Sequence, residues 1–239
     1  MKLLKILREE KSTGLKGGIY HQTQVKLAYN TNRMEGSKLS EEQTRYIYET
    51  NTLFLDNGET TANVDDIIET VNHFSCFDYM LDIADEPLSE QHIRRFHYLL
   101  KANTSDSKKP WFRVGDYKLQ PNMVGGAETT LPADVAHEMK NLIGAYHDKK
   151  IITLYDIIDF HFQFERIHPF QDGNGRVGRL VIFKECLANG IVPLIIEEEH
   201  KFFYYRGLAE YPSVKGYLTD TCLSAQDNYK NIIDYFLHK

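Results

Sequence analysis

Apolar side chains recur every three or four residues through most of this chain, the spacing that places them on one face of an α-helix. Capping signals support this pattern. Ser40 and Gln43 are typical of a capping box, and Asn63 and Ser89 can cap later helices. Pro132 suits a helix start and Gly190 a helix end. We therefore expect helices from 40 to about 51, after 63, 89 and 132, at 154–167, from the glycine-rich segment to 190, and at 214–236.

Residues 110–132 interrupt the helical pattern. Aromatic and valine residues are punctuated there by Gly115, Pro121, Gly125 and Gly126, which favours a short hairpin or flap. The chain shows no internal repeat, low-complexity tract or linker. We predict a mostly α fold: a single helical domain over residues 1–239 with a small β-hairpin flap and a C-terminal helical extension.

The charge and cysteine content exclude several classes of protein. A net charge of -6 gives the chain no bulk attraction to nucleic acid or to anionic lipid, so neither is an expected partner. Cys76, Cys186 and Cys222 lie too far apart for a metal-ligand or disulfide pattern, which favours a reducing, cytoplasmic compartment. The apolar start is too short for a signal-peptide core, and no uninterrupted apolar run approaches a membrane span.

Residues 168–179, HPFQDGNGRVGR, bring together the groups that a nucleoside triphosphate site needs. The glycines at 173 and 175 let backbone N–H groups approach an anion, and a helix that begins there points its positive end at the same anion. Arg176 and Arg179 lie three residues apart, so both can reach successive phosphates. Asp172 can hold Mg²⁺ against phosphate oxygens. The imidazole of His168 is nearly uncharged at physiological pH and can act as a base. The segment therefore fits phosphoryl or nucleotidyl transfer.

The same glycines also match the G-x-G-x-x-G spacing of dinucleotide-binding folds, and Glu197 lies about where such a fold places an acid. That loop must follow an apolar strand, whereas residues 162–169 are typical of a helix followed by a turn. A dinucleotide loop also has no use for His168, Asp172 and Arg179. We therefore set this interpretation aside.

Residues 168–179 resemble the signature of the Fic family, H-x-F-x-[DE]-G-N-G-R-x-x-R, at every fixed position. His161 and residues 165–167 lead into the signature in the way usual for that family. Residues 110–132 resemble the family's flap, and residues 204–208 resemble its segment beside the nucleotide base. The resemblance covers about residues 20–220. Most Fic proteins transfer AMP from ATP to a hydroxyl side chain of a target protein.

The resemblance implies a role for each matched residue. His168 would deprotonate the Ser, Thr or Tyr hydroxyl of the target, and Asp172 would hold the Mg²⁺ that bridges the α- and β-phosphates of ATP. Phe170 would be buried and anchor the loop. The implied nucleotide-binding residues are Gly173, Asn174 and Gly175 as the anion hole, with Asn174 on the α-phosphate, Arg176 on the β-phosphate, Arg179 on the γ-phosphate, and Tyr204 and Tyr205 beside the base.

Residues 31–36, TNRMEG, resemble the inhibitory motif [ST]-x-x-x-E-[GN] of autoinhibited Fic proteins. The resemblance implies an inhibitory helix over about residues 20–36, with Thr31 and Glu35 as its functional residues. A Glu35 carboxylate beside Arg179 would take the charge partner that the γ-phosphate needs, so that ATP would bind with its α-phosphate misaligned for attack. A Glu-Gly pair is also an ordinary helix C-cap, so a plain solvent-exposed helix end is the alternative.

Three further features carry expectations. In the Fic family a target segment pairs with the flap edge as an added strand, which would place a protein target along about residues 113–126. Lys118 stands in this flap where many Fic proteins carry Arg. Tyr204 and Tyr205 fit adenine stacking and core packing equally well. His161 is expected to be a hydrogen-bonded core histidine rather than a metal ligand.

These observations favour an autoinhibited Fic protein adenylyltransferase that uses Mg²⁺ and ATP. A second hypothesis is removal of AMP from a modified protein, with Glu35 orienting a water and a metal on Asp172. A third is a non-catalytic nucleotide-binding regulatory module, although such a module has no need of His168. A fourth is transfer of a different phosphate-containing group. The sequence leaves open the target protein, self-modification and assembly into a homo-oligomer.

Overall fold

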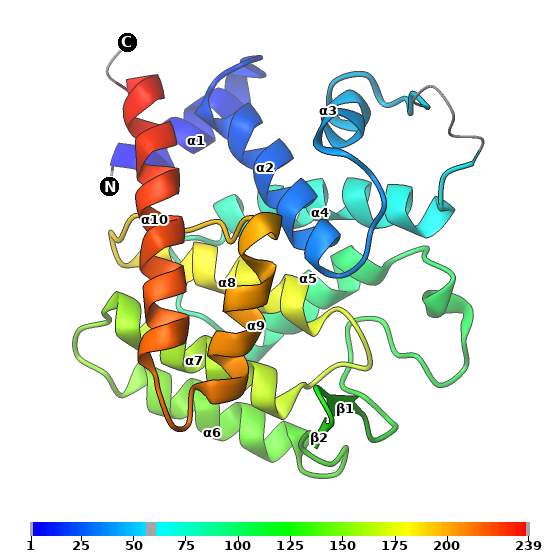
Figure 1. Ribbon diagram of the computed structural model, residues 1–239, viewed down its shortest axis with the longest axis vertical. Helices are drawn as coiled ribbons and strands as arrows, with labels where there is room; N and C mark the ends of the chain where they lie inside the picture. The colour runs from blue at the N-terminus through cyan, green and yellow to red at the C-terminus, as the bar shows by residue number, and fades with distance from the viewer. Residues whose placement is uncertain (1, 56–60, 238–239) are drawn as a thin grey trace.

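The computed structural model describes residues 2–55 and 61–237, and over these ranges the protein is built from helices with one two-stranded hairpin (Figure 1). Residues 1, 56–60 and 238–239 of the predicted domain lie outside the described residues. The mostly α fold that the sequence predicts is confirmed. The elements are α1 (Lys2–Thr13), α2 (Ile19–Met34), α3 (Glu41–Thr50), α4 (Val64–Asp82), α5 (Glu90–Lys101), η1 (Asp106–Lys108), β1 (Met123–Val124), β2 (Ala127–Glu128), α6 (Val135–His147), α7 (Leu154–Ile167), α8 (Asn174–Ala188), η2 (Glu198–His200), α9 (Lys201–Glu210) and α10 (Gly216–Leu237).

The core is arranged around α8, which lies in the middle of the molecule and packs against α7, α5, α4 and α2 (Figure 1). Val177, Leu180, Ile182 and Phe183 have almost no exposed surface. A helix that is buried on nearly every side is mostly apolar, and the charged residues that α8 also buries, Arg176, Arg179, Lys184 and Glu185, all form ion pairs. The N-terminus of α8 carries the glycine-rich motif. The packing therefore fixes the direction in which that end points. None of the described helices combines the length and the apolar character that crossing a membrane needs.

The capping signals mark helix starts accurately. Ser40 and Gln43 form both hydrogen bonds of a capping box on α3, and Asn63 and Ser89 cap α4 and α5. The helix expected at Pro132 begins three residues later, at Val135, because a turn precedes it.

Two helices, α1 and α9, were not predicted. Helix α9 reads KFFYYRGLAE, and aromatic residues on several of its sides remove the periodicity. Phe202 and Phe203 are exposed, whereas Tyr204 is buried.

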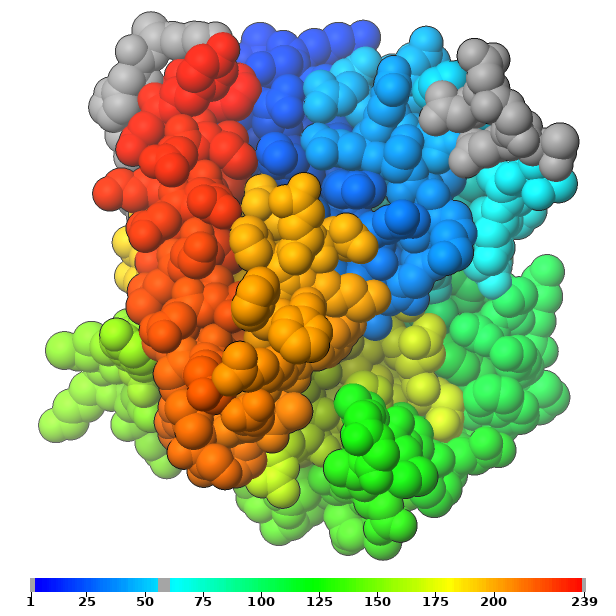
Figure 2. Space-filling model, in the orientation of Figure 1, coloured from blue at the N-terminus to red at the C-terminus, as the bar shows by residue number. Residues whose placement is uncertain are grey.

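The predicted flap is a hairpin, but a short one. Strands β1 and β2 pair antiparallel over two residues each, and Gly125 and Gly126 form the turn with φ of 58° and 83°. Positive φ at both central residues is the conformation that a tight hairpin turn requires and that glycine adopts without strain. The rest of 110–132 is loop and turn. The hairpin, in green, stands beside the yellow surface around the start of α8, below the blue end of α2 (Figure 2).

Candidate active site

The candidate catalytic loop, residues 168–173, joins α7 to α8 through two left-handed backbone positions. His168 ends α7 with φ of 50°, and Gly173 begins α8 with φ of 82°. Left-handed backbone is uncommon for a residue other than glycine, so the surrounding structure must hold His168 in place. This geometry turns the chain sharply. It places His168, at the end of α7, close to the start of α8.

A ring stack and a pair of hydrogen bonds hold the loop in this conformation. The ring of Phe170 is fully buried and stacks on His97 with centroids 4.0 Å apart. Asn174 closes the turn: its Oδ1 accepts from the Phe170 N–H at 2.8 Å, and its Nδ2 donates to the Phe170 carbonyl at 2.9 Å. The buried anchor expected of Phe170 is therefore present. The side chain of Asn174 is used within the loop, so its backbone N–H is the group it can offer to a phosphate.

The surroundings of His168 disfavour a charge on its imidazole. Its side chain is 17% exposed, and its Nδ1 is 3.9 Å from Glu165 Oε2. Burial, followed by the positive charge of Lys118, lowers the pKa of His168 to about 4. A neutral imidazole at physiological pH is able to accept a proton. Glu165 itself is held against ionisation, because burial raises its pKa to about 8.

The first turn of α8 forms the candidate anion site. Gly173 has no side chain to cap the helix, so the first N–H groups remain directed at whatever lies beyond the helix end. Arg176 and Arg179 follow on successive turns, and both guanidinium groups are nearly buried. Burial opposes a charge on each, but Glu69 raises the pKa of Arg176 and Glu35 raises that of Arg179. Two fixed positive charges thus accompany the positive end of a helix dipole.

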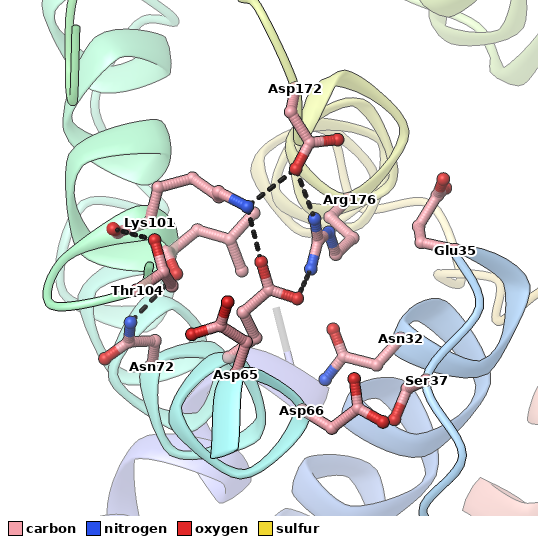
Figure 3. Close-up of polar contacts among 12 residues, drawn as sticks. Asn32, Glu35, Ser37, Asp65, Asp66, Asn72, Lys101, Thr104, Asp172 and Arg176 are labelled. Atoms are coloured by element: carbon pink, nitrogen blue, oxygen red, sulfur yellow. Dashed lines mark hydrogen bonds and ion pairs between the residues drawn. The ribbon is translucent and has the colours of Figure 1, made fainter. Parts of the chain in front are cut away.

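A network of charged residues, which we call the Asp172 network, holds one side of this site, and Figure 3 labels three of its members, Lys101, Asp172 and Arg176; the others are Glu69 and Asp106. Lys101 Nζ donates to Asp172 Oδ2 and to Glu69 Oε1, each at 2.6 Å. Arg176 donates to Glu69 and, at 3.2 Å, to the same Asp172 oxygen. Lys101 is 2% exposed, so its charge acts on Asp172 with little screening by water.

Sequence reasoning missed Lys101 and Glu69, because each is a single polar residue inside a helix far from the motif. The position of Lys101 held one usable signal. It directly follows Leu100, on the face of α5 that Ile93, Phe96 and Leu100 turn inward. A lysine on the apolar face of an amphipathic helix needs a buried partner.

Asp172 fits the metal-binding role expected of it. Although burial alone would raise the pKa of Asp172, Arg176 and Lys101 hold it well below its usual range, so the carboxylate is ionised. Its side chain is half exposed. Among the described residues, no group of three or more His, Cys, Asp or Glu side chains could hold a metal alone. A single carboxylate that completes its coordination with phosphate oxygens and water is the arrangement that Mg²⁺ commonly uses.

The last turn of α2 reaches into the anion site. Glu35 is the C-cap residue, and its Oε1 accepts a hydrogen bond from Arg179 Nη2 at 2.6 Å. Thr31 fixes the same guanidinium: its Oγ1 accepts from Nε at 2.5 Å and its carbonyl from Nη2 at 3.1 Å. A Cβ at Gly175 would overlap the Glu35 carboxylate. The structure therefore brings Thr31 and Glu35 to Arg179, beside the candidate anion site. The Glu35 side chain there is only partly exposed to solvent.

The two tyrosines of α9 occupy different environments. Tyr204 has no exposed surface and shares a hydrogen bond of 2.5 Å with His161 Nε2. This confirms the expectation of a hydrogen-bonded core histidine at His161. Tyr205 is 37% exposed, and its hydroxyl donates to the carbonyl of Met34 at 3.4 Å. Of the two, Tyr205 is the one that an adenine base could reach.

Comparison with known proteins agrees with this geometry. Residues 87–185 match the family model described as the Fic/DOC family. The protein adenylyltransferase fic-1 of Caenorhabditis elegans is 25% identical over 194 residues, which cover 78% of this chain and 36% of that protein. The protein adenylyltransferase Fic of Aedes aegypti is 23% identical over 180 residues, which cover 74% of this chain and 35% of that protein. The chain thus spans about a third of the length of these curated relatives.

Solved structures share the fold. A Fic domain containing signaling protein from Bacteroides thetaiotaomicron superposes with a TM-score of 0.72 and 24% identity, covering 97% of this chain and 90% of that one. A Fic family protein from Desulfovibrio desulfuricans gives a TM-score of 0.73 and 20% identity, covering 97% of this chain and 72% of that one. The overall fold of this chain is therefore a known one.

Proposed function

Because this chain contains a Fic/DOC-family domain, we propose that it is a protein adenylyltransferase, which moves AMP from ATP to a Ser, Thr or Tyr hydroxyl of a target protein. The observation that carries the proposal is the meeting, in one short loop, of a neutral base with a prebuilt anion site. His168 lies at one end of the loop, and the first turn of α8 with Arg176 and Arg179 lies at the other.

The chemistry follows from the placement of these groups. His168 accepts the proton of the target hydroxyl, and the hydroxyl oxygen forms a bond to the α-phosphorus of ATP. The bond from that phosphorus to the oxygen bridging the α- and β-phosphates breaks, and pyrophosphate leaves. Backbone N–H groups at the start of α8 and the guanidinium of Arg176 stabilise the negative charge on the phosphates. Mg²⁺ on Asp172, when bound, would neutralise charge on the phosphate oxygens.

The protein target would lie along the flap, about residues 113–126. Met123 and Val124 of β1 are exposed, and within residues 2–55 and 61–237 each strand of the hairpin pairs with no strand but the other. An exposed hairpin edge can accept an extended segment by backbone hydrogen bonding. The flap adjoins the catalytic loop, so a hydroxyl on such a segment would be presented near His168.

We also propose that Glu35 is an inhibitor built into the chain. Its carboxylate takes the Arg179 guanidinium that the γ-phosphate of ATP would otherwise pair with. Charge-assisted contacts of this kind are among the stronger hydrogen bonds in proteins. ATP that binds without this partner would hold its α-phosphate out of line with the attacking oxygen.

Replacement of the base tests the proposal. His168→Ala should reduce transfer from α-labelled ATP by about 10²–10⁴-fold, the usual cost of losing a general base. ATP affinity measured by calorimetry should hardly change, because the imidazole acts on the hydroxyl. His137→Ala, on the exposed surface of α6, is the matched control. Transfer at the parent rate by His168→Ala would refute the assignment of the base.

A further inference from the structure

A buried ammonium group lies at the base of the flap. Lys118 is 3% exposed, and its Nζ donates to Asn122 Oδ1 at 2.7 Å, to Thr129 Oγ1 at 2.6 Å and to the Ile167 carbonyl at 3.3 Å. These contacts use all three donors of the ammonium. Across residues 2–55 and 61–237, no carboxylate forms an ion pair with it. Burial lowers the pKa of Lys118 to about 8, which shows that the surroundings disfavour its charge.

The acceptors belong to two different parts of the chain. Asn122 and Thr129 face each other across the base of the hairpin, where the Thr129 hydroxyl also donates to the Asn122 carbonyl at 3.0 Å. Ile167 is the last residue of α7 and directly precedes His168. The Lys118 side chain therefore joins the start of the hairpin to the end of α7, which positions His168.

Further hydrogen bonds follow the same line. The backbone N–H of Lys118 donates to the Pro169 carbonyl at 2.9 Å, and Asn122 Nδ2 donates to the Phe170 carbonyl at 3.2 Å. The N–H of Gln120 donates to Gln171 Oε1 at 3.2 Å. The flap is thus hydrogen-bonded to residues on both sides of His168. Lys118 contributes at both the side-chain and the backbone level.

Lys118 also shapes the electrostatics of the base. Besides burial, the groups that act on the pKa of His168 are the Lys118 ammonium of the flap, the backbone of Glu165 in α7, the Glu35 carboxylate of α2 and the Asp172 carboxylate of the catalytic loop. The two carboxylates and the backbone hydrogen bond from Glu165 raise the pKa of His168, and the charge of Lys118 lowers it. Lys118 is the largest influence on His168 after burial. Removal of Lys118 would leave the charges of Glu35 and Asp172 unopposed from the flap side.

We propose that Lys118 is a positioning residue that fastens the flap to the catalytic loop, so that the surface presenting a target hydroxyl and the base accepting its proton form one rigid unit. The role of the flap toward a target rests on the function proposed above. The tether itself does not, because it is a property of the protein without ATP or target. An uncharged side chain at position 118 could neither donate three hydrogen bonds nor oppose the negative charges of Glu35 and Asp172 at His168.

The test compares Lys118→Met with Lys108→Met. Both variants remove one lysine charge, but Lys108 is an exposed residue of η1. Amide hydrogen exchange followed by mass spectrometry, without nucleotide, should show residues 119–129 exchanging about tenfold faster or more in Lys118→Met, because several hydrogen bonds are lost. NMR titration should show the His168 pKa rising from about 4 toward its ordinary value. Lys108→Met should change neither quantity.

Thr129→Val provides an independent variant in case Lys118→Met does not fold. It removes one acceptor of the ammonium with little change in shape, and flap exchange should rise in the same direction by a smaller factor. Unchanged flap exchange in both variants, or an equal change in Lys108→Met, would overturn the proposal. So would a His168 pKa that stays the same in Lys118→Met. Faster exchange and a raised His168 pKa, with no AMP transfer by any variant or by the parent, would retain the tether and reject the proposed function.

Discussion

Replacement of Glu35 by glycine should activate the protein. The carboxylate accepts from Arg179 Nη2 at 2.6 Å, the guanidinium is 4% exposed, and the Glu35 side chain is 29% exposed. A hydrogen bond to a charged group in such a partly buried place is worth about 1.5–3 kcal/mol. One factor of ten corresponds to about 1.4 kcal/mol. If that energy is what excludes productive γ-phosphate binding, Glu35→Gly should raise the rate of AMP transfer about ten- to a hundredfold.

The assay is incorporation of label from α-labelled ATP into the protein itself or into proteins of a cell lysate. Glu35→Gln keeps an acceptor at the same place but removes the charge, so its rate should fall between those of the parent and Glu35→Gly. Arg179→Ala in the Glu35→Gly background should lose activity, because the γ-phosphate then has no partner. An unchanged rate in Glu35→Gly would refute the inhibitory role, and an active double variant would show that Arg179 is not the shared contact.

Three further predictions concern the metal, the loop anchor and acid stability. Asp172→Asn should abolish the Mg²⁺ dependence of transfer together with the activity, as measured by a Mg²⁺ titration. Phe170→Ala should lower the free energy of unfolding by about 3–5 kcal/mol in urea, because the ring is fully buried. Acidification below about pH 6.5 should destabilise the fold, because a lowered pKa means that the folded state resists protonation that the unfolded chain accepts. For each such histidine, the free energy of unfolding falls by up to about 1.4 kcal/mol per pH unit. Glu165, whose pKa is raised to about 8, binds its proton in the folded state and so offsets one histidine. Urea titrations at pH 7 and pH 5 measure the net loss; equal stability would contradict it. The histidines concerned are His73, His97, His161 and His168, with pKa values lowered to about 3, 3, 3 and 4.

The helices could be predicted where local chemistry determines them. Side-chain caps at Ser40, Asn63 and Ser89 act within three residues, and the periodic stretch 154–167 matches α7 at both ends. Helix α9 escaped prediction because its placement depends on burial of Tyr204 against the rest of the molecule rather than on a regular apolar face.

In the candidate site, too, contacts between residues close in the sequence could be predicted, and contacts between distant helices could not. Residues of the motif lie within one turn and its following helix, so their proximity follows from the sequence alone. The Asp172 network depends on Lys101 and Glu69, which come from α5 and α4 and meet Asp172 only after the helices pack. The environment of Lys118 is also a tertiary result, because two of its acceptors lie across the hairpin base and the third lies at the end of α7. Sequence spacing carries no signal for such contacts.

The position of Glu35 at the end of α2 limits how the inhibition that we propose could be relieved. Ile19, Val25, Leu27 and Met34 of this helix are buried in the molecule's interior. Extraction of the whole helix would expose all of them, at a cost of roughly 1.5–3 kcal/mol for each large side chain, which is comparable with the total stability of a typical domain. An activator that pulled α2 away would therefore unfold the protein rather than switch it. Relief has to be local: a rotation of the Glu35 side chain, or a loosening of the turn at Gly36, whose φ of 104° already departs from the helix. Inhibition and its relief would then depend on the position of a single side chain, that of Glu35.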